Sequence, residues 1–168
     1  MIKAILVAIA LIFSSSVSFA LDRQAELLAG LPVSIKNFLN KKYPGWQLTP
    51  VPDKSIQDCD KETRSHPSIA TGDFNADGST DFAMLITHGG TIHVLEFLSR
   101  GGSYSENSLF RSPIAKLSGT AIQVEKKGKP TTVGTVERVD GILVSDCGSI
   151  PLRFVFSNGR VHNVTPRD

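Results

Sequence analysis

The sequence predicts an α+β fold in which an N-terminal helix packs on a mostly antiparallel β-sheet. Apolar residues recur every three or four positions between Leu28 and Leu39, which is the spacing of an amphipathic helix. Apolar runs flank both Gly89-Gly90 and Asn158-Gly159, two dipeptides that are typical of tight β-hairpins. A helix followed by successive hairpins favours an antiparallel sheet that is covered on one face by the helix.

The N-terminal segment has the pattern of a secretory signal peptide. Lys3 supplies a positive charge, residues 4–13 are an apolar stretch, and Ser18-Phe19-Ala20 fits a cleavage sequence of the A-x-A type. The apolar stretch is shorter than the roughly 20 residues of a membrane-spanning helix, although an uncleaved anchor is the alternative. We therefore expect residues 1–20 to be removed on export and residues 21–168 to form one domain, in the periplasm or outside the cell.

Charge and hydropathy favour neither nucleic acid nor a membrane as the partner of the mature chain. The formal net charge is +2 for the full sequence and about +1 once Lys3 is removed with the signal peptide, and basic and acidic side chains are interspersed along the sequence. The short basic run at 125–129 is typical of a solvated turn. We expect no membrane insertion after signal cleavage, because no later segment is apolar over the length that a span requires.

The helical segment is expected in two pieces. Pro32 disrupts a continuous helix but suits the first turn of a new one, so we expect a short helix over 22–29 and a second from Pro32 to Lys42. Tyr43-Pro44-Gly45-Trp46 then ends the second helix. Residues 50–67 lack apolar periodicity and are expected to form a loop.

Two cysteines, Cys59 and Cys147, are predicted to form one disulfide. An exported protein folds in an oxidising compartment, where an even pair of cysteines is most simply bonded. The bond would close a long loop and stabilise the fold by about 4 to 5 kcal/mol in the chain-entropy model. A nucleophilic cysteine is the alternative, but Asp58, Asp60 and Asp146 would raise the thiol pKa and so disfavour the reactive thiolate.

β-Structure is expected from Ile69 onward. In the hairpin around Gly89-Gly90, one face carries Phe82, Met84, Ile86, His93, Leu95 and Phe97. The other face carries Ala83, Leu85, Ile92 and Val94. Because both faces are largely apolar, we place this hairpin in the middle of the sheet, with the helix on one side. Further strands are expected at 104–110, 121–124, 131–135, 141–144, 152–156 and 161–164.

The stretch with specific chemistry is residues 73–81, which read D-x-N-x-D-G-x-x-D. A calcium ion takes six to eight oxygen ligands, and a curled loop can supply them from alternate positions. Gly78 permits the sharp backbone turn that this requires. The predicted ligands are four side chains and one carbonyl group, from Asp73, Asn75, Asp77, Asp81 and Ser79 respectively.

This loop departs from an EF-hand. Its twelfth position, where an EF-hand has a bidentate Glu, is Met84, and the flanking residues read as strands. We therefore expect a weak structural calcium site, with a Kd of roughly 10⁻⁴ to 10⁻³ M, as in extracellular modules. Magnesium is disfavoured because it demands a tighter octahedral geometry. The alternative is a turn without metal, since Asp, Asn and Gly form turns on their own.

The same loop resembles a known family. Residues 71–83, T-G-D-F-N-A-D-G-S-T-D-F-A, are similar to FG-GAP or VCBS-like repeats, the calcium-loop hairpins of integrin α-subunit propellers. The resemblance covers residues 68–88 and implies calcium ligation by the five residues just named. One copy is too little for a propeller. The chain also resembles a mostly uncharacterised group of small exported bacterial proteins with one such loop, through residues 42–46 and 154–168; this resemblance implies no activity.

The sequence contains no motif of a known catalytic centre. The serine-hydrolase elbow, the H-E-x-x-H zinc motif and a Gly-rich phosphate loop are all missing. His66, His88 and His162 are scattered, and His93 is expected to be a core residue. We therefore expect no catalytic and no cofactor-binding residues. The predicted function is an exported, calcium-stabilised binding or inhibitor module of the immunity type, with a protein partner. Alternatives are a secreted hydrolase using Asp and His near the loop, and a structural protein of the envelope.

Overall fold

The computed structural model describes residues 25–50, 68–114, 120–128, 138–145, 152–157 and 160–164. The chain divides into two compact units, Met1–Asn37 and Phe38–Asp168. The described part of the chain contains no helix with both the length and the hydropathy of a membrane span. Several predicted features lie outside the described residues, namely the signal peptide at 1–20, most of the loop at 50–67, the strand at 131–135, and both Cys59 and Cys147.

The helical segment is broken at Pro32, as predicted. Residues 25–29 are helical, and helix α2 (Val33–Lys42) begins immediately after the proline. The carbonyl group of Pro32 accepts the first hydrogen bond of the new helix from the amide of Lys36, at 3.1 Å. Proline is tolerated here because an amide hydrogen at the start of a helix has no partner within it.

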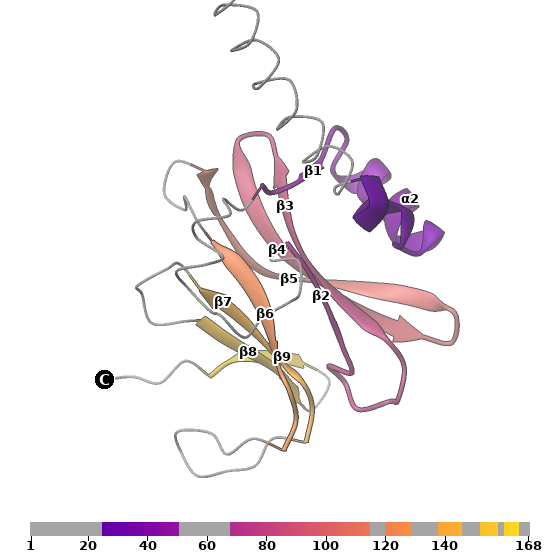
Figure 1. The fold of residues 1–168 in the computed structure, drawn as a ribbon, viewed down its shortest axis with the longest axis vertical. Coiled ribbons are helices and arrows are strands. Elements are labelled where there is room, and N and C mark those ends of the chain that lie inside the picture. The colour runs from indigo at the N-terminus through magenta and orange to yellow at the C-terminus, as the bar shows by residue number, and fades with distance from the viewer. Residues whose placement is uncertain are drawn as a thin grey trace, which may run out of the picture. The chain divides into compact units, whose positions relative to one another are not determined.

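A five-stranded antiparallel sheet is built around the predicted hairpin (Figure 1). The turn at Gly89-Gly90 has positive φ at both residues, 55° and 73°, which glycine adopts without steric cost. The register is the predicted one, with Phe82 opposite Phe97 and Ile86 opposite His93. The strands of this first sheet are β1 (Gln47–Leu48), β2 (Ile69–Gly72), β3 (Asp81–His88), β4 (Thr91–Arg100) and β5 (Ser103–Pro113).

The hairpin of β3 and β4 lies in the middle of this sheet, as predicted. Strand β5 pairs with β4, while β1 and β2 both pair with the other edge of β3. The pairing of β4 and β5 shifts register between Val94 and Leu95, which is a β-bulge. Strand β5 is longer than the predicted segment 104–110 but includes all of it.

The C-terminal strands form a second antiparallel sheet, in sequence order. Its strands are β6 (Ala121–Glu125), β7 (Gly141–Ser145), β8 (Leu152–Ser157) and β9 (Arg160–Asn163). All four overlap the predicted strands. Ser157 lies opposite Arg160, so the β8–β9 connection is two residues long, as the Asn158-Gly159 prediction requires. The conformation of these two turn residues lies outside the described part of the chain.

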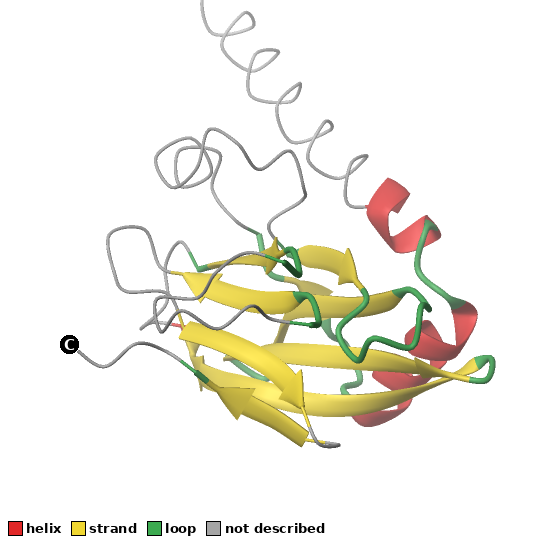
Figure 2. Ribbon diagram, turned by 90° about the horizontal axis from the view of Figure 1, so that it is seen from below, coloured by secondary structure: helices red, strands yellow, loops and turns green. Residues whose placement is uncertain are grey.

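The two sheets face each other across one apolar core, which the strand pattern did not predict (Figure 2). The first sheet and the loop after β2 contribute Ala70, Phe74, Ala83, Leu85, Ile92, Val94 and Leu98. The second sheet contributes Ile122, Ile142, Val144 and Phe154. The second sheet therefore covers one of the two apolar faces of the central hairpin, which we call the inner face. Removal of this apolar surface from water is the main force that holds two facing sheets together.

The described structure is mostly antiparallel β-sheet with two short helical segments, which confirms the predicted α+β class at this coarse level. The outer face of the central hairpin carries Met84, Ile86 and Leu95, all fully buried. The ring of Phe38, near the end of α2, stands edge-on to the ring of Phe97 on this face, with centroids 5.7 Å apart. Segment 38–46 thus contacts the outer face of the first sheet.

Candidate functional site

The predicted calcium loop connects β2 to β3 and is closed by its own side chains. The carboxylate of Asp73 accepts a hydrogen bond from the amide of Gly78, at 3.4 Å. The side-chain oxygen of Asn75 accepts one from the amide of Asp77, at 3.0 Å, and a carboxylate oxygen of Asp77 accepts one from the amide of Ser79, at 2.7 Å. The last two are bonds from a side chain to the backbone two residues on, which Asn and Asp favour.

Two residues of the loop adopt the left-handed backbone conformation. Gly78 has φ of 80°, so the predicted need for glycine at the sharp turn is confirmed. Ala76 has φ of 60°, which costs roughly 1 to 2 kcal/mol for a residue with a Cβ atom. The hydrogen bonds that Asn75 and Asp77 make on either side of Ala76 offset this cost.

Asp81 fixes the end of the loop to the sheet. Its side chain is fully buried, and its two carboxylate oxygens accept hydrogen bonds from the amides of Phe74, at 2.8 Å, and Ser99, at 2.7 Å. Burial raises the pKa of Asp81, and these two amide bonds oppose that rise. The residue predicted as the last calcium ligand therefore already ties the loop to strand β4.

Asp140 also belongs to this site, although its place next to Gly141 in the sequence is typical of a turn residue. It precedes β7 in the second sheet and is 4% exposed. Its carboxylate accepts hydrogen bonds from the amides of Asp73, at 3.1 Å, and Lys127, at 2.9 Å, and from the ammonium group of Lys126, at 2.9 Å. Its own amide donates to the carbonyl group of Asp73, at 3.1 Å. Asp140 thus connects the loop to the second sheet.

The charge and the close packing around Asp140 follow from these contacts. Burial alone would raise the pKa of Asp140, but the bonds from the Lys127 amide and the Lys126 side chain lower it below its usual value. A Cβ atom on Gly72 would lie 2.9 Å from an Asp140 oxygen and 2.7 Å from the ring of Phe74. Only glycine allows β2 and Asp140 to approach this closely.

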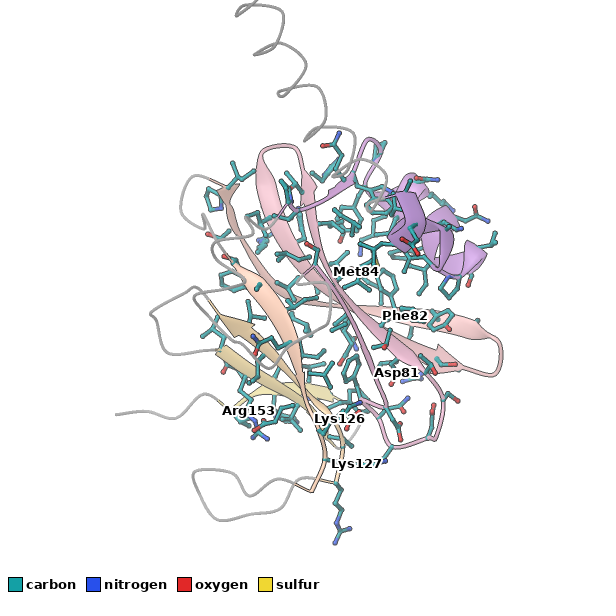
Figure 3. The ribbon with its side chains drawn as sticks, viewed as in Figure 1. Asp81, Phe82, Met84, Lys126, Lys127 and Arg153 are labelled. Atoms are coloured by element: carbon teal, nitrogen blue, oxygen red, sulfur yellow. The ribbon has the colours of Figure 1, made fainter. Side chains whose placement is uncertain are left out.

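Lys127 places a positive charge beside the first residue of the loop. Lys126 and Lys127 follow β6, at the end of the two sheets where Asp81 begins β3 (Figure 3). The ammonium group of Lys127 lies 3.2 Å from the carboxylate of Asp73. The lysine side chain is 53% exposed, so solvent screens the pair and its contribution to stability is below about 1 kcal/mol.

The loop has the donors for calcium but does not converge on an ion in this conformation. Carboxylate and carbonyl oxygens are the ligands that calcium prefers, and a carboxylate oxygen with one amide bond keeps a further lone pair. Yet no group of three or more His, Cys, Asp or Glu side chains in the described part of the chain is arranged to hold a metal ion. Calcium bound to the loop would compete with Lys127 for the carboxylate of Asp73.

His88 and His93 lie away from the loop. His88 ends β3 and Asp81 begins it, and this eight-residue strand spans roughly 23 Å. His93 is half-buried on β4, where its ring and that of His88 both pack against the ring of Tyr43. His162 lies on β9 in the other sheet. The structure therefore does not bring His88 or His93 together with the loop carboxylates.

Comparison with known proteins gives no relative from which a function can be transferred. No protein-family model, no curated protein and no solved structure matches the chain. The resemblance to calcium-loop repeats therefore depends on residues 71–83 themselves.

Proposed function

We propose that this protein is an exported, calcium-stabilised, non-catalytic domain that binds a protein partner, as an inhibitor or immunity-type module. The observation that carries the proposal is the place of the 73–81 loop in the fold. Its oxygen donors connect two strands of the first sheet, and Asp140 ties the same loop to the second sheet. An ion bound by this loop would act on both halves of the sandwich.

Calcium would stabilise the folded chain because the unfolded chain has no assembled site. The proposed ligands are the side chains of Asp73, Asn75, Asp77 and Asp81 and the carbonyl group of Ser79. Three carboxylates around one dication leave one net negative charge, so attraction favours binding. A ligand that binds only the native state raises stability by RT ln(1 + [L]/Kd), which is about 1.4 kcal/mol at a calcium concentration ten times the Kd.

A disulfide between Cys59 and Cys147 and a helix packed on the sheet complete the proposed module. Both features suit a small exported domain that keeps its shape outside the cell. The separation of His88 and His93 from the loop carboxylates favours this module over a hydrolase that would use these histidines with the loop.

The calcium part of the proposal is tested by thermal unfolding of the mature chain, residues 21–168. The midpoint should rise in millimolar calcium, and chelator should reverse the rise. Asp73→Asn and Asp77→Asn should abolish the calcium response, whereas Glu26→Gln, which removes one exposed carboxylate outside the loop, should retain it. Identical midpoints in calcium, magnesium and chelator would instead identify the loop as a turn without metal.

The binding part is tested separately. The mature chain, immobilised in calcium, should retain one protein from periplasmic extract at a stoichiometric ratio, and chemical unfolding of the bait should abolish the capture. Self-association of the purified chain in sedimentation, with no retained protein, would favour the alternative of a structural envelope protein.

A further inference from the structure

We propose that segment 38–46, at the C-terminal end of helix α2, is held on the first sheet by a pH-sensitive cluster and dissociates from it in mild acid. The cluster consists of Lys42, Tyr43, His88, His93 and Glu106, which we call the Tyr43 cluster. This inference is independent of calcium and of the proposed function, because all five residues lie outside the 73–81 loop.

Three rings form the centre of the Tyr43 cluster. Tyr43 is 8% exposed, and its ring centroid lies 5.1 Å from that of His93 and 5.6 Å from that of His88. The two imidazole centroids are 6.3 Å apart. The histidines come from adjacent strands, β3 and β4, so the tyrosine packs across both strands of the central hairpin. This packing is favourable for uncharged rings.

Glu106 supplies the polar half of the Tyr43 cluster. It lies on β5, opposite Phe97 of β4, and one carboxylate oxygen accepts a hydrogen bond from the hydroxyl group of Tyr43, at 3.1 Å. The other oxygen accepts one from the ammonium group of Lys42, at 2.7 Å. Two consecutive residues at the end of α2 therefore share one carboxylate of the sheet, and both bonds are strongest while Glu106 is ionised.

The charges around His93 disfavour its protonation while the segment is docked. Burial is the largest cause that lowers the pKa of His93, followed by His88 and by Arg111, which is its partner on β5. Lys42 adds a further positive charge from the helix end, and only Glu106 opposes these effects. Because Lys42 already occupies that carboxylate, an imidazolium at position 93 gains little compensation.

The lowered pKa of His93 determines the direction in which docking of segment 38–46 depends on pH. A histidine with a lowered pKa in the docked state contributes to docking above its ordinary pKa of about 6.5, and this contribution is lost as the pH falls below that value. The stability of the core between the sheets depends on pH in the opposite direction. Glu96, which is buried there, has its pKa raised to about 7, mainly by burial, so acidification favours the folded core. Mild acid should therefore release segment 38–46 and leave the sandwich folded.

Trp46 is a built-in reporter of this release. It is the one tryptophan of the chain, and its amide donates to the carbonyl group of Tyr43, at 3.0 Å. Its indole N–H donates to the side-chain oxygen of Asn40, at 2.9 Å. Trp46 is half-buried and immediately precedes β1, which pairs with β3, so its emission should respond when the helix end leaves the sheet.

The test is a titration of the mature chain from pH 8 to pH 5, followed by tryptophan emission and far-ultraviolet circular dichroism. Emission should change with a midpoint below 6.5 while the dichroism stays constant. The emission change should be lost in the variant His88→Gln, His93→Gln and retained in His162→Gln, which alters a histidine of the other sheet. A constant emission, or a change that survives the double substitution, would overturn the proposal. So would a loss of dichroism at the same midpoint, because this indicates global unfolding.

A second variant keeps the test decisive if the double substitution prevents folding. Tyr43→Phe retains the ring but removes the hydroxyl group that donates to Glu106. A weaker attachment should dissociate at higher pH, so the midpoint of the emission change should move up. An unchanged midpoint in Tyr43→Phe would contradict the proposed role of the Tyr43 cluster.

Discussion

At the scale of single residues, Glu96 shows how a buried charge sets a pH dependence. Its side chain is on the inner face of β4, is 1% exposed, and accepts a hydrogen bond from the side-chain amide of Asn107, at 2.8 Å. Burial raises its pKa to about 7, nearby Asp81 adds to the rise, and the Asn107 bond opposes it. Between about pH 4.5 and 7 the folded state holds a proton that the unfolded state has released, so the free energy of unfolding falls as the pH rises.

Glu96→Gln should remove this pH dependence. The amide has nearly the same size and no charge to desolvate, so the free energy of unfolding should rise at pH 8 by up to about 3 kcal/mol and change little at pH 5. Urea unfolding at the two pH values measures both quantities, and Glu26→Gln is the control for loss of an exposed carboxylate. An equal effect at both pH values would mean that packing, and not ionisation, determines the contribution of Glu96.

At the scale of elements, the sequence predicts the hairpins well because their determinants are local. Gly89-Gly90 and Asn158-Gly159 fix the turn lengths, and alternation of apolar residues then fixes the register, as the pairing of Phe82 with Phe97 confirms. Asp140 is different, because the backbone groups of Asp73 that it contacts are distant in sequence. They meet Asp140 only when the two sheets pack. No local pattern distinguishes it from an ordinary turn residue.

Asp140→Ala tests the connection between the loop and the second sheet. It removes the acceptor for the amides of Asp73 and Lys127, and an unpaired buried amide costs about 1 to 3 kcal/mol. We expect the free energy of unfolding to fall by about 2 to 4 kcal/mol. Lys126→Ala, which removes only the 63% exposed partner of the same carboxylate, should cost below about 1 kcal/mol. Equal losses in the two variants, measured by urea unfolding, would contradict the role of the amide bonds.

At the scale of the whole molecule, the sequence predicts strands but not their division between two sheets. Both faces of the β3–β4 hairpin are apolar, and this pattern requires a covering layer on each face. It does not indicate which segments of the chain form the two layers. The N-terminal helix suggests one layer; the other is the second sheet, which later strands form. The candidate site, too, is only partly predictable from local sequence. Its loop residues are evident from their spacing, while Lys127 and Asp140 enter it only through the packing of the second sheet on the first.

Because the two sheets share one core, a change in the second should destabilise the first. Ile142 lies on β7, is 1% exposed, and belongs to the apolar cluster that contains Leu85 and Val94 of the first sheet. Ile142→Ala should lower the free energy of unfolding by about 2 to 5 kcal/mol. At pH 7.5, urea unfolding followed by Trp46 emission, which reports on the segment beside the first sheet, and by circular dichroism should shift together in this variant. A shift in the dichroism alone would mean that the two sheets unfold separately and that the shared core does not couple them.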